Sequence, residues 1–70
     1  MEEIVKKAPK KRKVQVTVGA LNIRENPGMD EPVVDMIRDR GIYAITQEKN
    51  GWGKLDDKRG WIMLAHTQPV

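Results

Sequence analysis

The chain has 70 residues, 39% of them hydrophobic, and a formal net charge of +3 at pH 7. A chain of this length makes one domain at most and buries only about 60% of the surface that its unfolded form exposes, which leaves little room for a buried catalytic cleft. It contains no cysteine, so disulfides and cysteine-ligated zinc sites are excluded. No apolar run reaches the roughly 18 residues of a membrane span.

The positive charge is concentrated at the start of the chain. Residues 1–13 hold six of the 13 basic residues and two acids, whereas residues 14–70 hold seven basic and eight acidic residues. The first segment shows neither helical nor strand periodicity, and its charges repel one another. We therefore expect a flexible, disordered basic arm over residues 1–13 and one folded domain over residues 14–70.

Alternating apolar and polar residues predict several short strands in the domain. Val14, Val16 and Val18 alternate with polar residues, and Leu21 and Ile23 resume the pattern after a glycine. This two-residue period is typical of a strand with one buried face. Further strands are predicted over residues 33–37, 42–48, 52–55 and 61–64.

Turn signals separate these strands at short intervals. Pro27-Gly28 marks a long polar loop, and Asn50-Gly51 stands between two extended segments. Asn and Gly tolerate the positive φ of a tight hairpin turn, which makes this pair a strong hairpin signal. Five to six short antiparallel strands in so short a chain favour a small all-β barrel, because closure removes exposed strand edges.

Several short segments of the domain follow one another in a distinctive order. They are Leu21-Asn22-Ile23-Arg24, Pro27-Gly28, Pro32-Val33-Val34, Tyr43-Ala44-Ile45, Asn50-Gly51-Trp52-Gly53-Lys54-Leu55 and Gly60-Trp61-Ile62. In this order and spacing they resemble the bacterial SH3 family, over about residues 14–64. The resemblance implies an SH3-like barrel and a module that binds cell-wall peptides, either attached to wall hydrolases or free-standing in phages and prophages.

The residue inventory argues against catalysis. The chain has no Ser or Cys, and no general base stands near its three threonines in sequence. His66 is the single histidine, so a dedicated zinc site is not expected, and it is either an exposed tail residue or a ligand contact. Asp56 and Asp57 are best explained as part of a solvated charged turn. We expect no enzyme activity, no cofactor and no metal site.

The aromatic residues suggest where a ligand would bind. Trp52 and Trp61 each follow a glycine at the start of a strand. Either both are packing residues of the barrel, or one of them lines a shallow groove for an extended peptide together with flanking loop residues. Tyr43 is expected to face the core with its hydroxyl at a polar outlet. Arg24 is either a groove residue or an ion-pair partner of Asp30 or Glu31. The candidate ligand-binding residues are Asn22, Arg24, Asn26, Tyr43, Trp52 and Trp61.

The basic arm supports a different kind of contact. Lys10, Lys11, Arg12 and Lys13 are four consecutive cations that could neutralise a few phosphates of a polyanion in a sequence-independent way. The alternative is a solubilising leader or linker. Three functions are thus open: a module that binds a cell-wall or protein peptide, a structural or host-interaction protein of a phage or prophage, and a nucleic-acid tether.

The location of the protein is left open by the sequence. The first residues lack the apolar centre of a secretory signal. We therefore expect a cytoplasmic or virion-associated protein, or a cell-wall protein if the chain belongs to a larger exported one.

Overall fold

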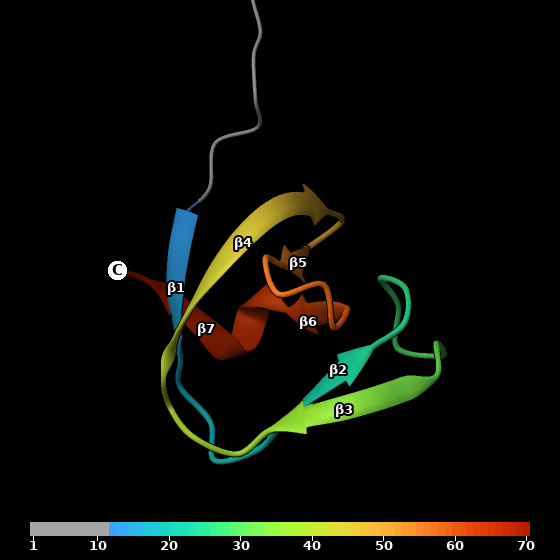
Figure 1. The fold of residues 1–70 in the computed structure, drawn as a ribbon, viewed down its shortest axis with the longest axis horizontal. Coiled ribbons are helices and arrows are strands. Elements are labelled where there is room, and N and C mark those ends of the chain that lie inside the picture. The colour runs from blue at the N-terminus through green and yellow to red at the C-terminus, as the bar shows by residue number, and fades with distance from the viewer. Residues whose placement is uncertain (1–11) are drawn as a thin grey trace, which may run out of the picture.

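The computed structural model describes residues 12–70, which contain seven β-strands and one 3-10 turn joined by loops (Figure 1). In chain order they are β1 (Arg12–Val16), β2 (Leu21–Arg24), β3 (Val33–Ile37), β4 (Ile42–Lys49), β5 (Trp52–Leu55), β6 (Trp61–Met63), the turn η1 (Leu64–His66) and β7 (Thr67–Pro69). The predicted small all-β fold is confirmed. Within these residues, no helix is long and apolar enough to cross a membrane.

The strands form one antiparallel sheet in the order β3-β2-β6-β5-β4-β1-β7. β4 is the longest strand, and it pairs with β1 through its first half and with β5 through its second half. Its register with β5 shifts between Ile45 and Gln47. Such a bulge bends and twists a strand, and Figure 1 shows β4 curving across the molecule. This curvature lets one sheet wrap around one core.

The core is aliphatic and draws on six of the seven strands. Of the alternating residues that were predicted to share one buried face, Val14, Val16, Leu21 and Ile23 are buried. Val18 lies beyond the end of β1 and is only partly buried against the core. The strands β3, β4, β5 and β6 each contribute one further residue to the cluster. Its members are Val14, Val16, Leu21, Ile23, Ile37, Ile45, Leu55 and Ile62.

Two residues that were predicted to belong to the basic arm lie in a strand of the sheet. Arg12 and Lys13, predicted to belong to the basic arm, form the first part of β1 and pair with Ile45 and Ala44 of β4. Strand pairing uses backbone groups, so the positive charge of these side chains does not prevent it. The rest of the predicted arm, residues 1–11, lies outside the described residues.

Two turns between strands contain glycines with positive φ. Asn50 and Gly51 both have positive φ, 52° and 86°, and join β4 to β5 in the tight hairpin that the sequence predicts. Gly60 has a φ of 151°. A Cβ at Gly60 would overlap the carbonyl oxygen of Arg24, so only glycine lets this turn approach β2.

Candidate functional site

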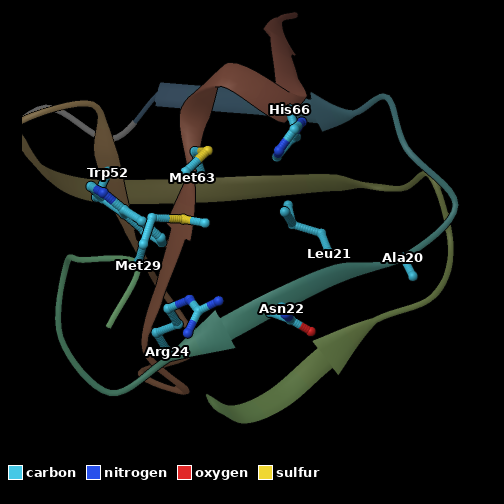
Figure 2. A pocket seen from close by; sticks show the side chains of 8 residues that line it. All are labelled: Ala20, Leu21, Asn22, Arg24, Met29, Trp52, Met63 and His66. Atoms are coloured by element: carbon cyan, nitrogen blue, oxygen red, sulfur yellow. The ribbon is translucent and has the colours of Figure 1, made fainter. Parts of the chain in front are cut away.

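A shallow pocket lies where β2 and the loop after it meet the strands β5 and β6 and the turn η1. Its volume is about 130 Å³, well below the roughly 300–1,000 Å³ of small-molecule sites. It therefore has room for one small part of a ligand. Figure 2 shows the lining side chains, which are Ala20, Leu21, Asn22, Arg24, Met29, Trp52, Met63 and His66.

Trp52 forms an apolar wall of the pocket. It is only 8% exposed, yet it does not belong to the aliphatic core cluster. Its neighbour Gly53 faces the core, since a Cβ there would meet Ile45, and alternation therefore turns Trp52 to the other side of the sheet. Trp52 is paired across the strands with Met63, which also lines the pocket. Trp52 is thus both buried and part of the pocket wall.

Arg24 brings a positive charge to the same pocket. Its Nη1 donates a hydrogen bond of 2.8 Å to the backbone carbonyl of Glu31. Of the two predicted roles, the structure places Arg24 at the pocket; within residues 12–70 it makes no ion pair with Asp30 or Glu31. A guanidinium carries five N–H donors, so most of them are left for a ligand.

The loop between β2 and β3 is held in place by its own hydrogen bonds. Asn26 Nδ2 donates to Glu31 Oε1 at 3.0 Å, and the N–H of Glu25 donates to the Pro32 carbonyl at 2.9 Å. Asn26, a predicted ligand residue, therefore supports the loop and is not among the pocket's lining residues. The same loop carries Met29, whose side chain is 61% exposed and lines the pocket.

The turn η1 places His66 at the pocket rim. The backbone carbonyl of His66 accepts hydrogen bonds from the N–H and the hydroxyl of Thr17, at 3.0 and 2.9 Å. These bonds anchor the turn, while the imidazole and the side-chain amide of Asn22 make no hydrogen bond within residues 12–70. His66 is thus exposed, as one of its two predicted roles requires, and its side chain lines the pocket.

Comparisons with protein-family models, with curated proteins and with solved structures gave no match. The resemblance to bacterial SH3 domains therefore rests on the sequence segments quoted above. Two of these segments, far apart in the chain, meet in the pocket: the first contributes Leu21, Asn22 and Arg24, and the second contributes Trp52.

Tyr43 lies in a different polar cluster. It packs against the core, as expected, and its hydroxyl donates to Asp39 Oδ1 at 2.8 Å, the polar outlet that the sequence analysis required. Arg59 lies 5.9 Å from the ring centroid and pairs with Asp57 and Asp35, at 2.8 and 3.3 Å. These groups mainly bond one another and connect the turn after β3 to the turn after β5.

Hydrogen bonds within this cluster shift the pKa values of two aspartates and of Tyr43. The Tyr43 hydroxyl, followed by the N–H of Gly41, holds the pKa of Asp39 below its ordinary value. The N–H of Met36, followed by Arg59, does the same to the pKa of Asp35. The bond to Asp39 and some burial raise the pKa of Tyr43.

The other predicted site residues lie apart from the pocket lining. Trp61 is paired with Arg24 across β2 and β6 and is half-buried, but it does not line the pocket. Arg12 pairs with Glu48 at 2.7 Å, which offsets part of its charge for a polyanion. Lys10 and Lys11 lie outside the described residues, and Lys13 is exposed on β1.

Two methionine side chains line the pocket although the sequence did not predict them there. Met29 and Met63 were not predicted as site residues, although Met63 alternates with the buried Ile62 of β6 and so could have been placed on the outer face.

Among residues 12–70, no three His, Asp or Glu side chains are arranged to hold a metal ion.

Proposed function

We propose that the chain is a non-catalytic binding module, related to bacterial SH3 domains, that holds an extended peptide in the pocket beside Trp52. The ligand is a peptide of the cell wall or of another protein. The observation that carries the proposal is a buried Trp wall beside two polar side chains, those of Asn22 and His66, that make no hydrogen bond within residues 12–70. Arg24 stands beside them with only one of its donors bonded, to the Glu31 carbonyl.

A comparison with the Tyr43 cluster supports this proposal. In the Tyr43 cluster, hydroxyl, carboxylate and guanidinium groups bond one another. At the pocket, by contrast, the imidazole and the Asn22 amide have no partner within the described chain. A concave apolar surface with a few converging polar groups is typical of binding sites, where these groups fix the orientation of the ligand.

The small volume of the pocket indicates weak binding. An isolated site of about 130 Å³ contacts only one residue of a peptide closely. The affinity left after the cost of ordering the ligand is then low. Attachment to a second binding unit would raise the effective affinity without new contacts.

Calorimetric titration with soluble peptidoglycan fragments tests the proposal. We expect fragments that carry the stem peptide to bind, and the same glycan without peptide not to bind. Asn22→Ala removes a pocket amide that makes no hydrogen bond within residues 12–70, so it should weaken binding with little loss of stability. Gln47→Ala, an exposed substitution on β4, is the matched control.

Two results would overturn the proposal. One is the absence of binding to any peptide-bearing fragment and to extended protein peptides alike. The other is an equal loss of affinity in the Asn22 and Gln47 variants, which would mean that the contact surface lies away from the pocket.

A further inference from the structure

We infer that the pocket recognises the free C-terminal carboxylate of a peptide whose last residue has a small apolar side chain. This inference rests on the proposed function and specifies its ligand. Arg24 would hold the carboxylate, and the side chain would lie against Met29 and Trp52. Figure 2 shows these three residues gathered at one end of the pocket.

Arg24 is oriented for this task before any ligand arrives. One guanidinium donor is fixed to the Glu31 carbonyl at 2.8 Å, and the loop that presents this carbonyl is itself held by the Asn26–Glu31 bond. The remaining donors are free within the described chain. The planar guanidinium matches the two oxygens of a carboxylate, and bonds of this kind are among the stronger ones in proteins.

The positive charge of Arg24 is not balanced by an acidic residue in the pocket lining. None of the eight lining residues is acidic, and two are basic, Arg24 and His66. In the loop, the Glu31 carboxylate accepts a hydrogen bond from Asn26, while the bond from Arg24 goes to the backbone carbonyl of Glu31. A pocket that is positive and free of acids is complementary to an anionic group of the ligand.

The size of the pocket favours a chain terminus over an acidic side chain. A terminal residue carries its carboxylate and its side chain on the same carbon atom, so both fit a cavity of about 130 Å³. An internal Asp or Glu would bring main chain on both sides of it, for which the pocket has little room. The apolar part of the lining then favours a side chain of about the size of alanine.

Three short peptides on the wild-type protein test the inference by NMR titration. They are acetyl-Ala-Ala with a free carboxylate, the same dipeptide as its amide, and acetyl-Ala-Glu amide, which carries its carboxylate on a side chain. We expect the free acid to bind about tenfold to a hundredfold more tightly than the dipeptide amide, the range for a charged hydrogen-bonded contact. The Glu amide should bind no better than the dipeptide amide.

Charge variants separate the role of Arg24 from a general effect of charge. Arg24→Gln should reduce the affinity for the free acid to that for the amide, and Arg24→Lys should restore only part of it, because an ammonium lacks the planar fork. Arg38→Gln removes the same charge from an exposed position outside the pocket and should change little. A dispersed NMR spectrum of each variant shows that it is folded.

The outcomes distinguish this inference from the proposed function. Equal binding of acid and amide, or equally tight binding of the Glu amide, would overturn the terminal-carboxylate inference while leaving peptide binding in place. The same holds if peptidoglycan fragments bind at the pocket but the free acid does not. If neither fragments nor dipeptides bind, both proposals fail.

Discussion

Gly60 lets the turn before β6 approach the backbone of β2 closely. A Cβ at this position would overlap the Arg24 carbonyl oxygen and press on Ile23, and the φ of 151° is unfavourable for other residues. We expect Gly60→Ala to lower the free energy of unfolding by about 3 kcal/mol or more, the sum of backbone strain and overpacking. Urea denaturation measures this loss.

Gly51→Ala is the matched control for that experiment. Gly51 also has a positive φ, 86°, but a Cβ there would meet no atom within 4 Å. The cost should then be strain alone, about 1 kcal/mol. Equal losses at Gly51 and Gly60 would show that steric overlap with β2 is unimportant.

Lys58 offers a stabilising substitution. It has a φ of 66°, a conformation that side chains disfavour, in the turn between β5 and β6. We expect Lys58→Gly to raise the free energy of unfolding by about 0.5–1 kcal/mol, because relief of strain exceeds the added entropy of the unfolded chain. A lower urea midpoint for this variant would refute the strained description of the turn.

At the scale of elements, the loop between β2 and β3 presents Met29 without depending on it for stability. Met29 is 61% exposed and lies outside the core cluster. Met29→Ala should therefore change the free energy of unfolding by less than about 0.5 kcal/mol, yet weaken peptide binding because one apolar wall of the pocket is lost. Unchanged affinity for peptide-bearing fragments would remove Met29 from the site.

The turns after β3 and β5 make stability depend on pH. The pKa values of Asp35 and Asp39 lie below the ordinary 3.8, so their stabilising effect is present above pH 3.8 and is lost as the pH falls through the lowered values. Tyr43 has a pKa raised from 10.0, so its contribution is present below pH 10.0 and is lost as the pH rises through the raised value.

Urea midpoints measured across the acid range check this prediction. We expect the midpoint to fall as the carboxylates are protonated, and Asp39→Asn to show a smaller fall than the unmodified protein. A variant that follows the same acid curve would mean that the bond between Tyr43 and Asp39 contributes nothing to stability.

At the scale of the whole molecule, the strands that could be predicted are those whose own sequence carries apolar alternation or a turn motif. Apolar alternation marks β1 and β2, and Asn50-Gly51 marks the hairpin of β4 and β5. β7 carries no such signal in Thr67-Gln68-Pro69, and it is defined instead by pairing with β1, a contact between residues far apart in the chain. The start of β1 at Arg12 depends on β4 in the same way.

Part of the pocket lining was predictable from sequence. Asn22, Arg24 and Trp52 were proposed from sequence and lie together, whereas Tyr43 contributes to another cluster. Met29 and Met63 reach the pocket through the loop path and the pairing of β5 with β6, which sequence patterns do not specify. The site thus depends on tertiary contacts more than the fold class does.

The most direct test of peptide binding at this pocket follows the indole N–H signal of Trp52 in an NMR titration. Trp52 lines the pocket and its indole makes no hydrogen bond within residues 12–70, so a ligand there changes its surroundings. We expect saturating peptide-bearing cell-wall fragment to shift this signal and the backbone signals of Asn22 and Arg24, and to leave those of Tyr43 and Arg59 in place. An unmoved Trp52 signal, or larger shifts at Tyr43 and Arg59, would contradict binding in the pocket.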